Sequence, residues 1–248
     1  MRTVLRGVSF ALLAGAPAEG HAGELAPADA GSIGEAASEI GSRYGVRVAS
    51  DVPMPEVFEP VAPHSRVGAV VVPAAPARWD DAAEPRATAH RALDAIAAAA
   101  PGRWTVVDHG GLLELRPADG GVLAAPVRVP AAPGLTAAQA LASVGEQLQA
   151  HHGTAVLPTP MFPGFLKAAL PEGWSAAGPA NGVLARILED GCACANWHVR
   201  VGGDGSIVSL NIHKQTGFDV RPWDYDTAAD EALIRSFEAA NALPWPDP

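Results

Sequence analysis

The stretch WTVVDHGGLLEL, residues 104–115, has a counterpart in WHVRVGGDGSIVSL, residues 197–210. Each begins with tryptophan, continues as an apolar strand, breaks at a glycine-containing turn and closes on a second apolar strand, which is typical of a β-hairpin. Helix-like, strand-like and helix-like segments precede both stretches in the same order, from about residue 33 and again from about residue 135. Since an internal repeat limits the fold more than any single residue does, the sequence predicts two related modules, at 33–120 and 121–217.

Each module is expected to be an α+β unit of the βαββαβ type, with two helices packed on a short mixed or antiparallel sheet that ends in the hairpin. Apolar residues between 33 and 40 have helical spacing, and Gly45 is placed to end that helix. Thr88 is expected to cap the next helix and Thr136 the first helix of the second module. Residues 122–129 are expected to form the strand that opens the second module.

The run ALDAI, residues 92–96, leads to the first hairpin, and the run VLARIL, residues 183–188, leads to the second. This order of a helix, a strand, a Pro/Gly loop, a strand, an alanine/leucine helix and a hairpin resembles the short N-terminal (STN-like) domain of secretins and TonB-dependent transducers. The resemblance implies a non-enzymatic α+β domain of the bacterial envelope that docks partner proteins. The loop at 73–85 is longer than in that family, so the resemblance extends to the fold and the general role alone.

Residues 1–22 have the features of an export signal: Arg2 and Arg6 precede a short apolar stretch, and small residues follow around His21. The alternative is a buried N-terminal helix, which Glu19 and nearby prolines disfavour. Residues 23–32 are expected to be a flexible leader. No later segment reaches about 18 apolar residues, so we expect no transmembrane span and a periplasmic or secreted location.

The chain is acidic, with 17 basic and 27 acidic residues and a net charge of −10. Removal of residues 1–22 would leave 15 basic and 26 acidic residues, a net charge of −11. Nucleic acid and anionic lipid are therefore not expected as partners, because binding either one requires clustered Lys or Arg.

The two cysteines, Cys192 and Cys194, allow one intramolecular disulfide, which would close a very small ring. A less favoured hypothesis is a Zn²⁺ or copper site formed by these cysteines with His198 and His213, although their spacing matches no zinc signature. The thiols lack the CxxC arrangement that lowers a cysteine pKa, which disfavours a redox role.

Catalytic and nucleotide-binding motifs are missing from the sequence: it has no nucleophile elbow, HExxH, Walker loop or dinucleotide fingerprint. No cofactor is therefore expected. The tail at 218–248 carries seven acidic residues and two arginines. Its aromatic residues Trp223, Tyr225 and Trp245 are candidates for partner binding, or they pin the tail to the second module.

These observations predict an exported, non-enzymatic envelope protein that acts as a protein–protein or ligand interaction module. The alternative is a metal-binding protein or an enzyme with its site in the second module or between the two modules, where pockets often form. Polar side chains that converge between the modules would favour the enzyme. An open sheet edge would favour the binder.

Overall fold

The computed structural model describes residues 24–25, 33–54, 70–71, 78, 80–81, 83–100, 102–160, 165, 167–193, 195–201 and 207–214. The first half of the chain forms β1 (Glu24–Leu25), α1 (Ile33–Tyr44), β2 (Val48–Met54), β3 (Val70–Val71), α2 (Glu84–Ala99), β4 (Trp104–Asp108) and β5 (Leu113–Pro117). The second half forms the 3₁₀ turn η2 (Val122–Ala124), β6 (Pro126–Val129), α3 (Ala137–His152), β7 (Ala155–Pro160), β8 (Ala176–Pro179), α5 (Ala180–Cys192), β9 (Ala195–Val201) and β10 (Ile207–Lys214).

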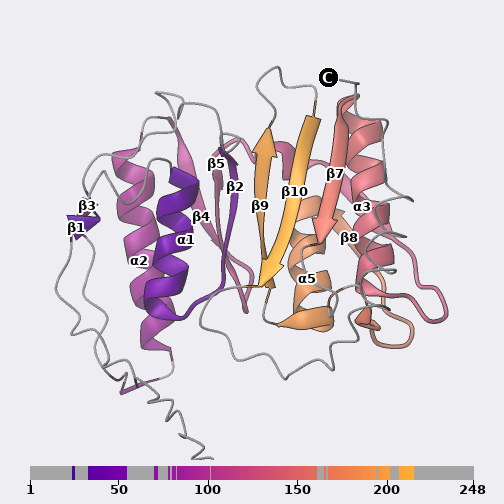
Figure 1. Cartoon of the computed structure of the whole chain (residues 1–248), viewed down its shortest axis with the longest axis horizontal. Coiled ribbons are helices and arrows are strands. Elements are labelled where there is room, and N and C mark those ends of the chain that lie inside the picture. Colours follow the sequence, from indigo (N-terminus) through magenta and orange to yellow (C-terminus); the bar gives the residue numbers. More distant parts are fainter. Residues whose placement is uncertain are drawn as a thin grey trace, which may run out of the picture.

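One six-stranded mixed sheet runs through both halves in the order β4-β5-β2-β9-β10-β7 (Figure 1). In the first half β4 and β5 are an antiparallel hairpin, and β5 continues parallel to β2. The second half repeats this pattern with β9, β10 and β7. A parallel contact between β2 and β9 joins the halves. The predicted α+β class is confirmed, and this contact joins the strands of both halves in one sheet.

Two short antiparallel sheets lie apart from the main one, β1 with β3 and β6 with β8. Strand β1 falls within residues 23–32, where the sequence predicts a flexible leader, so Glu24–Leu25 departs from that prediction. The sequence does not predict a residue range for β8, but this strand is the third strand of the predicted βαββαβ order in the second half. Each small sheet pairs the strand before the first helix of its half with the strand before the second helix.

The two hairpins have equivalent registers. Val106 pairs with Leu115 in the first hairpin, and Val199 pairs with Leu210 in the second. These are the pairs that result when the two tryptophan-led stretches are aligned as the sequence suggests.

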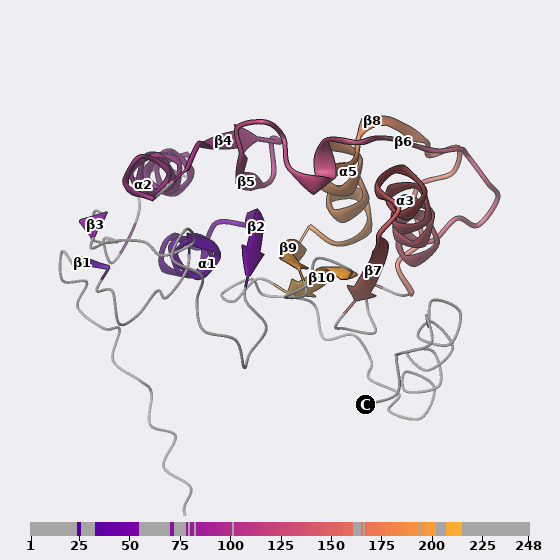
Figure 2. The same cartoon turned by 90° about the horizontal axis from the view of Figure 1, so that it is seen from above.

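The helices of the two halves cover opposite faces of the sheet (Figure 2). The register explains this arrangement, because Leu115 pairs with Ser50 and Ser50 pairs with His198, which places the three side chains on one face. Leu115 belongs to the core under α1 and α2, whereas the neighbours of His198, Trp197 and Val199, point to the other face and into the core under α3 and α5. A shift of one residue along a strand exchanges its faces.

Each half accordingly has its own hydrophobic core. The first is built around α1 and α2 with Val48, Leu113 and Leu115. The second contains Trp197, which is fully buried, together with residues of α3, α5 and β10. Ala49 and Leu112 come from the first half but pack in the second core, which agrees with their place on the opposite face of β2 and β5.

Several local predictions can be compared with the observed elements. Helix α1 ends before Gly45, and Thr136 caps α3 through a capping box with Gln139, as predicted. Helix α2 begins at Glu84 with a proline in its first turn, so Thr88 lies inside the helix and the predicted cap is wrong. The predicted strand at 122–129 is also wrong at its start, where η2 precedes β6. Of the helices that the structure describes, none is both long and apolar enough to cross a membrane.

Candidate functional site

Polar side chains converge where the first half meets helix α5. Glu114 of β5 is fully buried, and its Oε2 lies 2.8 Å from His109 Nε2. Asn181, at the start of α5, donates a hydrogen bond of 2.9 Å from Nδ2 to the same oxygen. The other carboxylate oxygen, Oε1, is buried and has no hydrogen-bond partner among the described residues. A single buried carboxylate therefore connects the β4–β5 turn with the second half.

A second polar link between the halves is the ion pair of Arg47 with Glu189 of α5. The Arg47 side chain is 4% exposed, and its Nε donates a hydrogen bond of 3.0 Å to the carbonyl oxygen of Gly111. A Cβ at position 111 would collide with both the Arg47 guanidinium and the Glu189 carboxylate. A larger residue at position 111 would therefore displace the ends of these two side chains and disturb the ion pair.

Asp51 of β2 is the third buried group at this junction, with 1% exposure. Its Oδ2 accepts a hydrogen bond of 3.3 Å from the backbone N–H of Leu123 in η2. Burial raises the pKa of Asp51 to about 8, and the nearby Glu114 carboxylate acts in the same direction. The Leu123 hydrogen bond and Arg116 oppose this rise. Asp51 is therefore protonated at neutral pH.

The reversed placement of the second half explains why these groups are buried. Asp51 of β2 and Glu114 of β5 lie on the face that points away from α1 and α2, and Arg47 immediately precedes β2. In a half that stood alone this face would meet solvent, as polar positions of a one-sided sheet usually do. Here α5 and η2 cover it. The groups of this polar junction bond mainly to each other and hold the two halves together.

The outer edge of β4 is a different kind of site. The N–H of Ala118 donates to the Arg103 carbonyl oxygen, and the N–H of His109 donates to the Leu112 carbonyl oxygen, at 2.9 Å each. Because hydrogen-bonded and non-hydrogen-bonded pairs alternate along an antiparallel ladder, these two bonds show which residues of β4 bond to β5. By this alternation Thr105 and Val107 bond to β5, whereas the backbone groups of Val106 and Asp108 point away from it. Strand β4 is the last in the sheet order, so within the described part of the chain no strand pairs with this edge.

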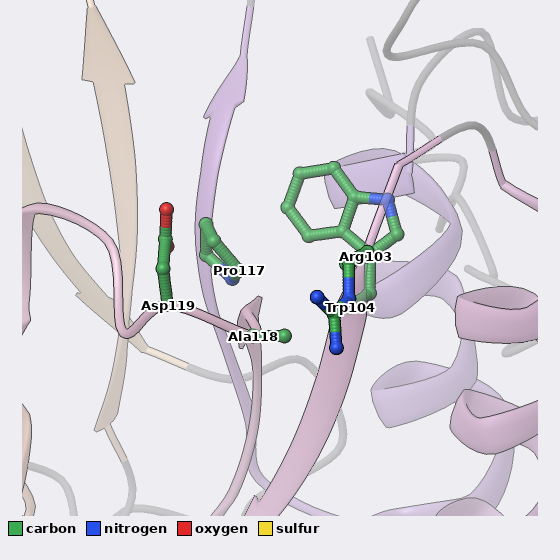
Figure 3. Close-up of a pocket in the computed structure, with 5 residues that line it drawn as sticks. All are labelled: Arg103, Trp104, Pro117, Ala118 and Asp119. Carbon is green, nitrogen blue, oxygen red and sulfur yellow. The ribbon is translucent and has the colours of Figure 1, made fainter.

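A cavity of about 460 Å³ opens at the start of β4 (Figure 3). Trp104, Pro117 and Ala118 supply its apolar surface, while Arg103 and Asp119 add one charge of each sign. Figure 3 shows Pro117 between the Trp104 ring and Asp119. Such a mixture of apolar surface and a few polar groups is typical of sites that take a side chain.

The opposite edge of the sheet, β7, is built differently. Its sequence includes Pro158 and Pro160, which have no N–H to donate. The ladder between β7 and β10 tolerates them only where their nitrogens face outward, the usual place of proline in a sheet. This edge is therefore a poor acceptor of a further strand, and the two edges are not equivalent.

The residues that the sequence singled out lie elsewhere. Cys192 ends α5, is buried and is disulfide-bonded, whereas Cys194 lies outside the described residues. His198 is buried in β9, and His213 pairs in register with Asn196 of that strand. No metal-binding group of three or more His, Cys, Asp or Glu occurs among the residues that the structure describes. That search omits Cys194 and the side chain of His213, so it does not test the metal hypothesis, which would also require reduction of the Cys192 disulfide to free its thiolate.

The tail residues Trp223, Tyr225 and Trp245 and the export signal at 1–22 also lie outside the described residues. The polar junction was not predicted. Its only signal in the sequence is a charged residue within an apolar strand, such as Glu114 between Leu113 and Leu115. Solvent-exposed strand positions show the same pattern, so the sequence does not distinguish the two.

No protein-family model matches the chain, and comparison with curated proteins and with solved structures finds no similar protein. The resemblance to the STN-like domain therefore stays a prediction.

Proposed function

We propose that this chain is an exported, non-enzymatic interaction protein that binds an extended segment of a partner protein along β4. The observation that carries the proposal is the outward-facing backbone of Val106 and Asp108 at the end of the sheet. A segment that adds to a sheet edge gains affinity from backbone hydrogen bonds and specificity from pockets for alternate side chains. The cavity at Trp104 is placed to supply such a pocket at one end of the edge.

The export signal predicted at 1–22 supports a location of this binding in the envelope or outside the cell. The contrast between the edges supports the choice of β4. Natural sheets protect edges that must stay unpaired with proline, charge or bulges. Strand β7 has two prolines, whereas β4 has none over Trp104–Asp108.

The test compares two substitutions at one position. Val106→Pro removes the outward N–H, and the ladder to β5 does not use that group. Val106→Ala also shortens the side chain but keeps the N–H, so it is the matched control. Extended peptides selected from a random library on the purified protein would be titrated against the wild type and both variants.

We expect wild type and Val106→Ala to bind a selected peptide with similar Kd, and Val106→Pro to bind it about tenfold more weakly, a loss of about 1.4 kcal/mol. Bound peptide should also slow hydrogen exchange at the amides of Val106 and Asp108. Equal affinity of all three proteins, or a selection that yields no binding peptide, would refute the proposal. Melting curves of the variants verify that each is folded.

A second candidate function, an enzyme, is favoured by one observation: the junction holds Asp51, whose pKa is raised to about 8, near Glu114, which in turn contacts His109. Groups with perturbed pKa values gather at active sites. Against this, Glu114 is fully buried and bonded within the protein. A hydrolase substrate screen of wild type and Asp51→Asn tests it, and activity that the substitution abolishes would favour the enzyme.

A further inference from the structure

A second cavity, also of about 460 Å³, lies in the other half of the molecule beside β6, β8 and α5. Two arginines line it, Arg128 of β6 and Arg186 of α5, and Ser175 adds a hydroxyl. The rest of its lining is small and apolar, with no carboxylate. In a chain with a net charge of −10, a cavity with only positive side-chain charge is unusual.

Among the described residues, no carboxylate oxygen lies within 4.0 Å of the Arg128 or Arg186 guanidinium. The ion pairs within the described part of the chain use other arginines, Arg43, Arg47 and Arg86. Two like charges at one cavity repel each other unless an anion lies between them. Both arginines are exposed, and no ion pair of the described residues neutralises the positive charge that they bring to the cavity.

The surroundings hold Arg186 in place. Its Cζ lies 5.5 Å from the centroid of the Trp174 ring, within cation–π range. The ring itself is fixed, because Trp174 is 7% exposed and its Nε1 donates a hydrogen bond of 2.6 Å to Asp190 Oδ2. This contact limits where the Arg186 guanidinium can lie, and its planar set of N–H groups suits an oxyanion.

Arg128 is anchored through its backbone. On one side it pairs with Ala177 of β8. On the other side the Gln147 amide of α3 bonds it twice, accepting from the Arg128 N–H and donating to the Arg128 carbonyl oxygen, at 2.9 Å each. Both arginines thus start from rigid elements, which favours preorganised binding.

We propose that this cavity binds a small organic anion, whose phosphate or carboxylate group meets Arg128 and Arg186 while its body contacts the apolar walls. Arginine recognises both oxyanions with paired hydrogen bonds. The site is separate from β4 and goes beyond the function proposed above.

Titration calorimetry with inorganic phosphate, glycerol phosphate and citrate as probes tests the site, with chloride at equal ionic strength as the control for general charge screening. We expect at least one probe to bind below about 10 mM. Arg186→Gln and Arg128→Gln should each weaken it at least about tenfold. Arg91→Gln, which removes an exposed arginine of α2 in the other half, should leave the affinity unchanged.

Arg186→Lys keeps the charge but loses the planar fork of N–H donors, so we expect it to bind more weakly than wild type. Affinity equal to that of wild type in both glutamine variants, or no binding of any probe at about 10 mM, would overturn the proposal. If Val106→Pro had no effect on peptide binding, the anion proposal would still stand, because that variant should bind the anion as wild type does. A preference for glycerol phosphate over phosphate would show that the apolar walls take part.

Discussion

The two halves of the chain have the same strand order but expose different surfaces. In each, a tryptophan-led hairpin lies beside a parallel strand and two helices cover one face. The second half is turned over relative to the first, because Ser50 of β2 lies opposite His198 and not opposite Trp197. A single register at β2–β9 thus decides which face α5 covers.

This difference separates the roles of equivalent positions. Glu114 of the first hairpin is buried against Asn181, whereas Ser209, its equivalent in the second hairpin, is half-buried. The outer edges differ as well, since β4 lacks the prolines of β7. Similar local sequence patterns therefore lead to different environments. The first half has the buried Glu114 and the open β4 edge, whereas the second half has the half-buried Ser209 and the proline-containing β7 edge.

Trp197 and Trp104 begin equivalent strands, and their replacement should reveal the largest difference between the halves. Trp197 is fully buried, so Trp197→Ala should reduce the free energy of unfolding by about 3–5 kcal/mol. Trp104 is only half-buried, so Trp104→Ala should lose about 1–2 kcal/mol. Urea denaturation measures both, and equal losses would contradict the placement of Trp197 in the larger core.

Asp51→Asn should alter how stability depends on pH. The pKa of Asp51 is about 8 in the folded protein, above its ordinary 3.8, so the folded state keeps a proton that the unfolded chain releases above pH 4. The contribution of Asp51 to the free energy of unfolding is therefore fully present below pH 4 and is lost as the pH rises to about 8. Asparagine resembles the protonated acid and removes this loss.

One pKa unit corresponds to about 1.4 kcal/mol, so we expect Asp51→Asn to be more stable than wild type by a few kcal/mol at pH 8 and nearly equal to it at pH 4. The neighbouring charges of Glu114, Arg116 and Asp119 are unchanged in both proteins. Denaturation at the two pH values measures the difference. A constant difference between variant and wild type would show that Asp51 is not buried in its acid form.

Asn181→Ala tests the polar junction between the two halves. It removes the amide that donates to the buried Glu114 carboxylate, and we expect a loss of about 1–3 kcal/mol, although alanine favours the helix. The control is His90→Ala, which breaks an exposed pair with Asp94 in the first half and should change stability by less than about 0.5 kcal/mol. If both variants melt at the same temperature, the hydrogen bond from Asn181 to Glu114 does not stabilise the polar junction.

The smallest effect on stability is expected at the β7 edge. Replacing Pro158 and Pro160 together with threonine and valine would restore two N–H groups to the outer edge, with a stability change below about 1 kcal/mol. The variant should self-associate at high concentration, because an unprotected edge pairs with other strands. Sedimentation velocity measures this, and a strictly monomeric variant would show that the prolines do not protect the edge.

Much of the local structure followed from sequence patterns, because these depend on near neighbours. The hairpins, the Gly45 end of α1 and the Thr136 cap rest on glycine conformation, apolar spacing and capping chemistry. Thr88 was misplaced because Pro85 starts α2 a turn earlier, a competing signal in the same stretch.

The sequence by itself determined the α+β class, the equivalent hairpins and the two helices of each half, since each depends on residues close together in the chain. Only the tertiary structure decided that the two halves share one sheet and that the second half lies turned over on it. That choice depends on one register, that of Ser50 with His198, which lie 148 residues apart in the chain, and no local pattern encodes it. It brings α5 over Arg47, Asp51 and Glu114, so residues that read as solvated strand positions became the buried joint of the molecule.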